Sequence, residues 1–177
     1  NDFENLVNKF CPDLLVVTAL ESTFEGSIRL LGHVRHYHIP TVIGGVFPTS
    51  APERVIACPE IDMVCVGEGE KAIVELVRKM REGKDYSQVP NLLVKQKDGR
   101  IIKNPLYTLV SFNDNPLVDM EIFEDARFYR AMGGKIYKMF PVETHRGCSY
   151  SCGFCNSQLQ NKMYKEKTNQ IFFRCKS

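Results

Sequence analysis

Alternating strand and helix patterns over residues 1–90 constrain the fold of this chain more than any other feature. An apolar run of strand length is followed by a stretch with helical spacing, and this pair occurs three times in succession. The paired ranges are 13–20 with 23–37, 41–45 with 51–57, and 61–66 with 70–82. Three consecutive strand–helix units are typical of a parallel sheet with helices on its faces. We therefore expect an α/β fold, a doubly wound parallel sheet of the Rossmann or flavodoxin-like type.

The remainder of the chain departs from this alternation. Asp98-Gly99 lies between two alternating segments and predicts a hairpin. Residues 105–125 are rich in proline, asparagine and acidic side chains, which predicts an extended linker. A second domain is expected to begin near Lys135. The expected divisions are an α/β domain at 1–90, a hairpin and linker at 91–134, and the second domain at 135–177.

Composition argues against several classes of protein. The 23 basic and 21 acidic residues give a net charge of +2, which provides no broad field for nucleic acid, so we expect no RNA or DNA partner. No apolar run approaches the roughly 20 residues of a membrane helix, and no membrane partner is expected. The 7 cysteines are an odd number, which argues against a disulfide scaffold and indicates a reducing, cytoplasmic location.

Polar and glycine-rich segments follow each of the three expected strands. Ligands of doubly wound sheets bind beyond the carboxyl ends of the strands, so we expect these segments to line a ligand pocket. Glycine suits such a place because a backbone without side chains can approach a bulky ligand closely. The candidate binding residues are Thr18, Leu20, Ser22, Gly44, Gly45, Gly67, Glu68 and Gly69.

The run from Gly67 to Ala72 also matches G-x-G-x-x-A between a strand and a helix, which is the dinucleotide fingerprint. Glu68 and Glu70 flank the place where a pyrophosphate would lie. Two carboxylates there would repel it, so the run does not favour dinucleotide binding.

Three cysteines near the end of the chain have C-x3-C-x2-C spacing: Cys148, Cys152 and Cys155. Three thiolates on one short loop can hold three corners of a [4Fe–4S] cluster and leave the fourth iron open. An open iron can bind and activate a small molecule, which indicates catalysis. The alternative is a structural zinc site with His145 as fourth ligand. The crowding of the ligands into one loop and the strand-like stretch at 137–144 favour the cluster.

The cysteine spacing, with Phe154 directly before the third cysteine, resembles the C-x3-C-x-aromatic-C motif of the radical S-adenosylmethionine (SAM) superfamily. The resemblance implies that Cys148, Cys152 and Cys155 bind the cluster and that Phe154 lies at the cofactor. It implies that the open iron takes the amino and carboxylate groups of SAM, whose carbon–sulfur bond is cleaved to a 5′-deoxyadenosyl radical. It also implies a small-molecule substrate, an electron donor such as flavodoxin or ferredoxin, and a (β/α) barrel that begins in the second domain.

A second resemblance concerns the cobalamin (B12) binding domain that precedes many radical SAM barrels. Thr18-x-Leu20 is similar to its S-x-L element, Gly44-Gly45 to its glycine pair, and V-G-E-G-E at 66–70 is typical of such domains. The resemblance implies that these segments line a pocket for the nucleotide tail of cobalamin. The family's D-x-H-x-x-G loop does not occur in the 177 residues, which leaves the lower cobalt ligand open. We interpret the chain as a fragment that lacks the domain's start and most of the barrel.

Together the two resemblances imply a cobalamin-dependent radical SAM enzyme that transfers a methyl group to an unactivated carbon or a related group. No side chain is assigned a catalytic role, and the fragment alone is expected to be inactive. A methylthiotransferase acting on tRNA is one alternative, although the N-terminal region offers only isolated cysteines and nearly balanced charge. A non-catalytic module that binds cobalamin or zinc is the other.

Overall fold

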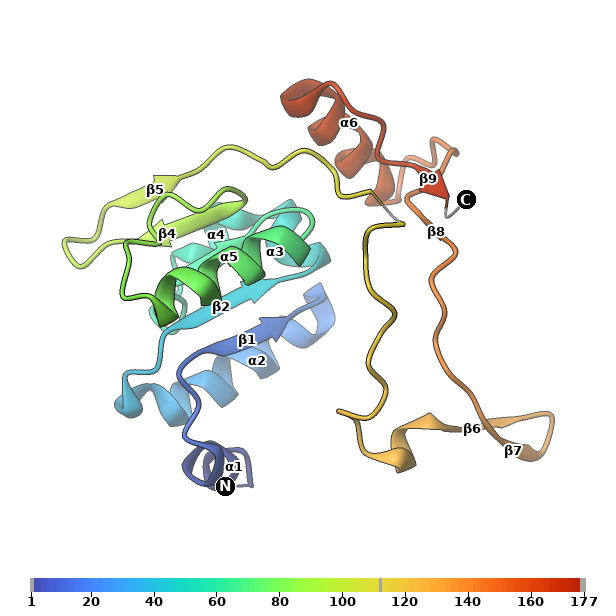
Figure 1. The fold of residues 1–177 in the computed structure, drawn as a ribbon, viewed down its shortest axis with the longest axis horizontal. Coiled ribbons are helices and arrows are strands. Elements are labelled where there is room, and N and C mark those ends of the chain that lie inside the picture. Colours follow the sequence, from blue (N-terminus) through green and yellow to red (C-terminus); the bar gives the residue numbers. More distant parts are fainter. Residues whose placement is uncertain (1, 112, 176–177) are drawn as a thin grey trace.

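A five-stranded sheet forms the centre of the computed structural model, which describes residues 2–111 and 113–175 (Figure 1). The strand order is β1-β2-β3-β4-β5. The bounds are β1 Leu15–Thr18, β2 Thr41–Gly44, β3 Met63–Cys65, β4 Leu92–Lys95 and β5 Ile101–Lys103. β1, β2 and β3 are parallel, and β4 and β5 are antiparallel to their neighbours. The predicted α/β class is confirmed, with a mixed sheet in place of a wholly parallel one.

The antiparallel direction of β4 results from the path of the chain after β3 and its helix. Leu92, the first residue of β4, pairs with Cys65, the last residue of β3. The Val66 N–H donates to the Asn91 carbonyl over 2.8 Å. The chain has therefore returned to the carboxyl edge of β3 before β4 begins, and the turn at Asp98-Gly99 then adds β5 as a hairpin partner.

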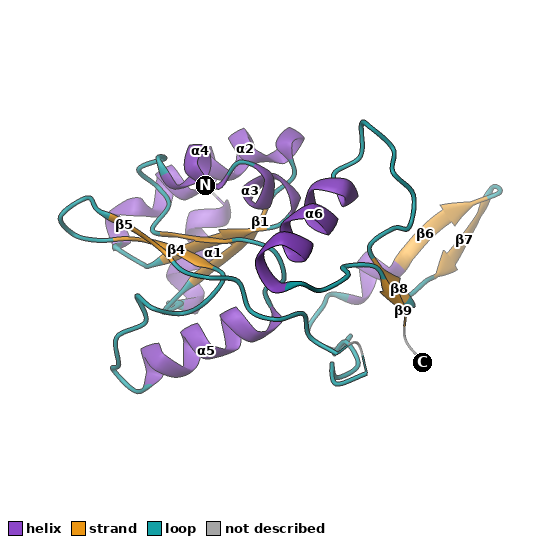
Figure 2. Cartoon of the chain, turned by 90° about the horizontal axis from the view of Figure 1, so that it is seen from above, coloured by secondary structure: helices purple, strands orange, loops and turns teal. Residues whose placement is uncertain are grey.

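Helices cover both faces of the sheet, with α2, α3 and α4 on one face and α5 on the other (Figure 2). Their bounds are α1 Asp2–Phe10, α2 Glu21–Val34, α3 Val46–Ser50, α4 Pro52–Ile56 and α5 Glu70–Arg81, and a 3₁₀ turn, η1, spans Arg35–Tyr37. α3 was not predicted. Pro52 begins α4, where a missing amide hydrogen costs no intrahelical bond.

Two apolar clusters make up the core, one on each face of the sheet. Ile43 and Val64 pack on the side of α2 and α4, whereas Val42 and Met63 pack on the side of α5. Successive side chains of a strand point to opposite faces, so strands buried on both faces are continuously apolar. This explains the apolar runs of β2 and β3. β1 is the edge strand of the sheet, and its residues alternate in burial, with Val16 58% exposed.

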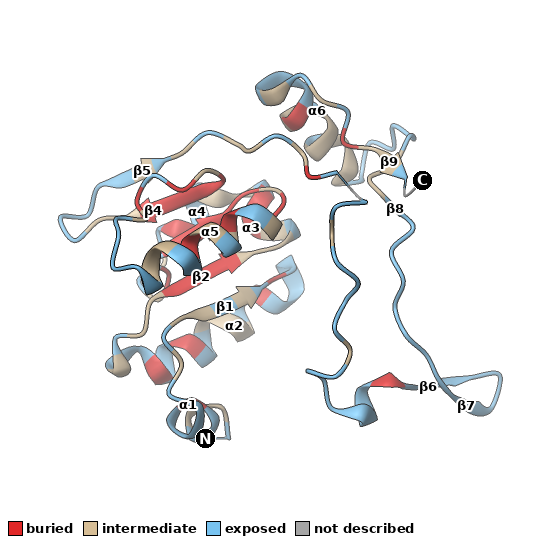
Figure 3. Cartoon of the chain, viewed as in Figure 1, coloured by how far each residue is buried: buried red, intermediate tan, exposed pale blue. Residues whose placement is uncertain are grey.

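The rest of the chain is extended and largely exposed, as the pale blue segments of Figure 3 show. Residues 104–124 contain neither helix nor strand among those described, in line with the expected linker. The later elements are η2 Asp125–Phe128, β6 Tyr129–Met132, β7 Lys135–Lys138, β8 His145–Arg146, α6 Ser157–Thr168 and β9 Arg174–Cys175.

The predicted strand at 137–144 is wrong beyond Lys138. β7 pairs with β6 in a hairpin, and the six residues that follow it have no regular structure. Pro141 lacks the amide hydrogen that a central strand donates, and Val142 is 80% exposed, so neither residue supports a buried strand. Nowhere in the described part of the chain is there a helix long and apolar enough to span a membrane.

Candidate functional site

A cavity of about 560 Å³ lies at the carboxyl edge of the parallel strands. It is lined by five of the residues predicted from the sequence, namely Thr18, Gly45, Gly67, Glu68 and Gly69. The later part of the chain lines it too, through Arg146, Gly147, Ser157, Gln160 and Phe172. The cavity therefore lies between the α/β sheet and the segment that carries the three cysteines. Its volume is within the range of roughly 300–1,000 Å³ common for ligand sites.

The loops after β1 and β2 pack directly on each other at one side of this cavity. Gly45 has a φ of 102°, and a Cβ atom there would lie 2.6 Å from Thr18 Oγ1. The Ala19 N–H donates to the Gly44 carbonyl over 3.0 Å, and the Phe47 N–H donates to the Ala19 carbonyl over 3.3 Å. A glycine is thus required at position 45 by contact between the loops, whether or not a ligand also approaches it.

Three of the predicted binding residues do not line the cavity. Leu20 is 55% exposed and directly precedes α2, where its N–H donates to the Thr23 hydroxyl oxygen over 3.0 Å. Ser22 is exposed on the first turn of α2, and Gly44 lies behind Gly45 at the end of β2. Their assignment to cofactor binding stays a prediction.

The carboxylate of Glu68 is almost completely enclosed, with 7% of the side chain exposed. Its Oε1 accepts from Arg146 Nη1 over 2.8 Å and also from Arg174 Nη2. Its Oε2 accepts the Val110 N–H over 3.3 Å. A buried carboxylate requires such partners, because an unpaired charge in a dry environment is strongly destabilising.

Arg146 stands between three carboxylates. Its guanidinium donates to Glu68, to Glu70 over 2.5 Å and to both oxygens of Glu143 over 2.8 and 2.9 Å. These bonds, the Glu143 bonds foremost, raise the pKa of Arg146, and the same bonds lower the pKa of the Glu143 carboxyl. The charges of Glu68 and Glu70 are therefore paired. The expected repulsion of a pyrophosphate by two free carboxylates does not describe this edge.

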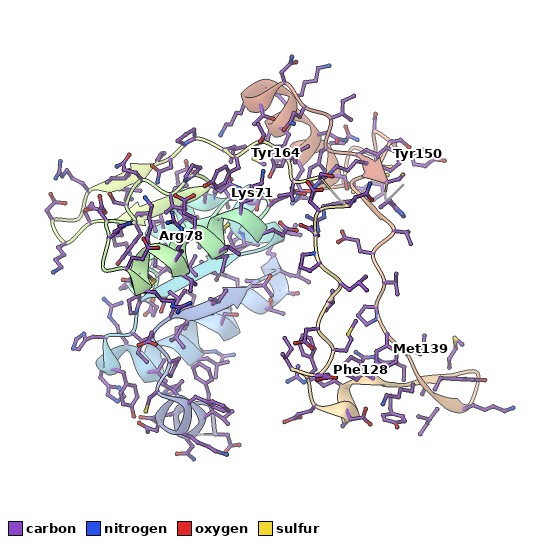
Figure 4. The ribbon with its side chains drawn as sticks, in the orientation of Figure 1. Lys71, Arg78, Phe128, Met139, Tyr150 and Tyr164 are labelled. Carbon is purple, nitrogen blue, oxygen red and sulfur yellow. The ribbon has the colours of Figure 1, made fainter. Side chains whose placement is uncertain are left out.

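Helix α6 contacts the same edge through Tyr164, which is 1% exposed. Its Oη accepts the Glu68 N–H over 2.8 Å, and its ring stacks on Phe172 with centroids 5.3 Å apart. Burial is the main cause that raises the pKa of Tyr164 to about 12. In Figure 4, Tyr164 lies between α6 and the sheet, whereas Tyr150 of the cysteine loop is on the outer side.

The cysteine loop lies between β8 and α6. The Cys148 thiol is half-buried and those of Cys152 and Cys155 are exposed, and all three are free thiols. Hydrogen bonds from the backbone and hydroxyl of Ser157 lower the pKa of Cys155. The loop bends at Cys155, whose N–H donates to the Cys152 carbonyl over 3.1 Å.

Metal-ligand geometry is not formed in this structure. Within residues 2–111 and 113–175, no group of three or more His, Cys, Asp or Glu side chains is placed to hold a metal ion. The donors themselves suit an iron–sulfur cluster, since three free thiols on one loop supply the soft ligands that iron–sulfur chemistry needs. His145, the fourth ligand of the zinc alternative, has its Nδ1 3.2 Å from the Thr144 hydroxyl. Phe154, predicted to lie at the cofactor, is 94% exposed.

Among the residues of the site that were not predicted from the sequence are Arg146, Tyr164 and Thr49. Thr49 is 5% exposed and its hydroxyl accepts the Gly67 N–H over 3.0 Å. Arg146 stands two residues before the first motif cysteine, and Tyr164 is an aromatic residue in a mainly polar helix. These are the only signals in the sequence for Arg146 and Tyr164, and neither one indicates the bonding partner.

Comparison with known proteins gives a family match for the first part of the chain. Residues 1–77 match the B12 binding domain family. An uncharacterized methyltransferase of Pyrococcus horikoshii is 29% identical over 164 residues, which are 90% of this chain and 35% of that protein. The cobalamin-dependent radical SAM methyltransferase TokK of Streptomyces tokunonensis is 27% identical over 82% of this chain and 22% of its own length. The chain thus spans about a third or less of these relatives.

A solved structure has the same fold. The radical SAM methyltransferase TsrM of Kitasatospora setae, with cobalamin and a [4Fe–4S] cluster bound, aligns with a TM-score of 0.60 at 20% identity. The alignment covers 89% of this chain and 34% of TsrM. It extends beyond the matched domain, so the fold likeness includes part of the segment after residue 77. Residues 1–77 thus match the B12 binding domain family, in a chain that is similar over most of its length to radical SAM methyltransferases.

Proposed function

We propose that this chain is the cobalamin-binding and cluster-binding part of a cobalamin-dependent radical SAM enzyme. The observation that carries the proposal is the shared cavity: residues of the matched domain line one side, and the segment with the cysteine motif lines the other. Two cofactors that act on one substrate must face a common space. The motif supplies the cysteine donors, and Gly147 and Ser157, which flank them in sequence, line the cavity together with Thr18 and Gly45.

Under this proposal, Thr18, Gly45 and the Gly67–Gly69 loop contact cobalamin, and Cys148, Cys152 and Cys155 hold a [4Fe–4S] cluster beside Phe154. The cluster supplies the electron that cleaves SAM and so begins radical chemistry. The chain's own residues hold the two cofactors in a fixed relation and exclude water from the space between them. In the proposed reaction a methyl group is transferred to an unactivated carbon or a related group of a small-molecule substrate. A flavodoxin or ferredoxin as electron donor and a cytoplasmic location belong to the same proposal, which involves neither nucleic acid nor membrane.

Anaerobic reconstitution of the 177-residue chain tests the cluster. Iron and sulfide should give a brown protein with about four irons per chain, and replacement of Cys152 by serine should reduce the iron bound. Colourless protein with one tightly held zinc would instead establish the structural zinc site. Iron incorporation that is unaffected by Cys152→Ser would also overturn the assignment.

Hydroxocobalamin retention tests the other cofactor. Val46 lines the cavity and is 39% exposed, so Val46→Trp should fill part of the cavity and weaken retention. Val77 on α5 is 38% exposed and does not line this cavity, which makes Val77→Trp the matched control. Equal retention by the two variants would contradict a cobalamin site at this edge. A chain that retains cobalamin but forms no cluster would be a non-catalytic binding module, the second candidate, which the match limited to residues 1–77 favours.

A further inference from the structure

Every polar group of Glu68 is bonded to a segment that approaches the carboxyl edge of the sheet. The N–H donates to Tyr164 Oη, and the carbonyl accepts from Asn91 Nδ2 over 2.6 Å. One carboxylate oxygen accepts the Val110 N–H, and the other accepts from Arg146 and Arg174. Tyr164 and Arg174 are 96 and 106 residues away from Glu68 in sequence, yet Tyr164 bonds its backbone N–H and Arg174 bonds its carboxylate. Glu68 therefore joins parts of the chain that no local structure joins.

The two arginines come from the strand pair that frames the cysteine loop. Arg146 belongs to β8 and Arg174 to β9, and the two residues are directly paired in the β8–β9 ladder. With 20% and 18% of their side chains exposed, both guanidinium groups are largely removed from water at the Glu68 carboxylate. Charge-assisted hydrogen bonds in such surroundings are stronger than those between exposed groups.

The bonds to Glu68 hold the cysteine loop at both of its ends. Arg146 lies two residues before Cys148, and Tyr164 lies on α6, the helix that follows the last cysteine. α6 is also tied to the loop itself, since Asn161 Nδ2 donates to the Cys148 carbonyl over 3.1 Å. Arg146 is thus fixed on the Glu68 carboxylate and Tyr164 on the Glu68 backbone N–H, and together these bonds fix the loop between them.

Gly67 gives a second observation on the contact between α6 and the carboxyl edge of the sheet. Its φ is 79°, and a Cβ atom there would overlap the Tyr164 hydroxyl. The glycine at this position is thus required by the approach of α6. The first half of the V-G-E-G-E run serves the contact with the cysteine segment as well as the cavity.

We propose that Glu68 is a positioning residue: it clasps the cysteine loop to the carboxyl edge of the B12-binding domain, and so sets the place of the cluster relative to the cobalamin. The second half of this statement rests on the proposed function, and the first half does not. The Glu68 carboxylate acts through Arg146 and Arg174, while its backbone N–H bonds Tyr164, and Glu68 is not itself a catalytic residue.

Hydrogen exchange of the full chain without cofactors tests the clasp. Glu68→Gln keeps the size of the side chain but removes its charge, so amides of residues 145–175 should exchange about tenfold faster or more. Amides of β1, β2 and β3 should keep their rates. Glu53→Gln is the matched control, because Glu53 also pairs with a distant cation, Lys103, but is 65% exposed. That variant should leave residues 145–175 unchanged.

Combining Glu68→Gln with the two arginine substitutions separates the clasp from a general loss of stability. If Glu68 acts through the arginines, then Glu68→Gln added to Arg146→Gln and Arg174→Gln should accelerate exchange little further. Unchanged exchange of 145–175 in Glu68→Gln, equal acceleration over the whole chain, or full additivity with the arginine variants would each overturn the proposal.

A spectroscopic measurement on reconstituted protein tests the consequence for the cofactors. After loading with iron, sulfide and hydroxocobalamin and reduction, the magnetic interaction between the cluster and cob(II)alamin should be weaker in Glu68→Gln than in the parent or Glu53→Gln. The same interaction in all three proteins would refute the positioning role while the proposed function stands. If the parent binds neither cofactor, the proposed function fails, and hydrogen exchange still decides whether the clasp exists.

Discussion

Substitution of Gly67 by alanine provides a quantitative test of the contact between α6 and the sheet. Gly67 and Gly83 both have left-handed φ values, 79° and 63°. A Cβ atom at Gly83 would meet nothing within 4 Å, whereas one at Gly67 would overlap the Tyr164 hydroxyl. Gly83→Ala thus reports the cost of the backbone conformation, and Gly67→Ala reports that cost plus the displacement of Tyr164.

The magnitudes follow from the local contacts. An alanine in the left-handed region costs roughly 1–2 kcal/mol, which is the whole effect expected at Gly83. At Gly67 the alanine also breaks the bond between the Glu68 N–H and Tyr164 Oη and leaves a buried donor unpaired, which adds about 1–3 kcal/mol. The expected excess of Gly67→Ala over Gly83→Ala is therefore about 2 kcal/mol.

Urea unfolding and hydrogen exchange of α6 amides together measure this excess, because α6 can detach locally without unfolding the sheet. Tyr164→Phe completes a double-mutant cycle with Gly67→Ala. Without the hydroxyl, the nearest atom to a Cβ at position 67 is the ring carbon Cζ, at 3.1 Å. The excess should shrink in that background. If Gly67→Ala and Gly83→Ala behave alike in both measurements, the docking of α6 on Gly67 is wrong.

Three further predictions concern titration and thiol reactivity. The pKa of Tyr164 is raised to about 12, so its contribution to stability is full below the ordinary pKa of 10 and is lost as the pH rises through 12. Ultraviolet titration should show one fewer late-ionising tyrosine in Tyr164→Phe than in the parent. Burial raises the pKa of the Cys65 thiol to about 12, whereas the pKa of Cys155 is lowered. An alkylating reagent at neutral pH should therefore modify Cys155 rapidly and Cys65 only on unfolding, which peptide mass analysis would show. The bonds from Arg146 lower the pKa of Glu143, so this ion pair stabilises the folded chain above the ordinary pKa of 4.5, and the stabilisation is lost as the pH falls through the lowered pKa. Hydrogen exchange of amides at 143–146 should accelerate at that low pH, and less so in Glu143→Gln.

Elements of the α/β domain could be predicted because their signals are local. The range 70–82 differs by one residue from α5, and the range 41–45 by one residue from β2. Asp98-Gly99 marks the hairpin between β4 and β5. The apolar periodicity and turn residues that define these elements lie within each element, so no knowledge of the fold is needed to read them.

The elements that were missed depend on contacts or on weaker local signals. α3 contains Pro48 and only five residues, too few for a helical period to appear. The exposed hairpin of β6 and β7 turns at Gly133-Gly134, a recognised turn signal that the expected strand at 137–144 obscured. The direction of β4 depends on the position that the chain reaches after α5, and the composition of the sequence does not indicate that position.

The residues of the candidate site also divide into those that local signals predict and those that depend on distant contacts. The rule that ligands lie beyond the carboxyl ends of parallel strands selected Thr18, Gly45 and the Gly67–Gly69 loop, and the structure does bring them to one cavity. Their contact with cobalamin stays a prediction. Arg146 and Tyr164 meet Glu68 across 78 and 96 residues, and no local pattern indicates a pairing at that distance.

The ion pairs of Arg146 with Glu68 and Glu70 connect the glycine-rich motif at 66–70 to the cysteine motif. Taken separately, V-G-E-G-E suggests a ligand loop and R-G-C opens a cluster loop, but Glu68 and Glu70 of the first motif bind Arg146 of the second. Removal of one partner of a buried ion pair costs about 3–5 kcal/mol, more than either motif gains from an exposed contact. The two motifs therefore constrain each other as two sides of one interface. A chain that keeps the carboxylate and loses Arg146 should fold its α/β sheet and hold its cysteine loop less firmly, through Arg174 and Tyr164, so amides of the loop should exchange faster.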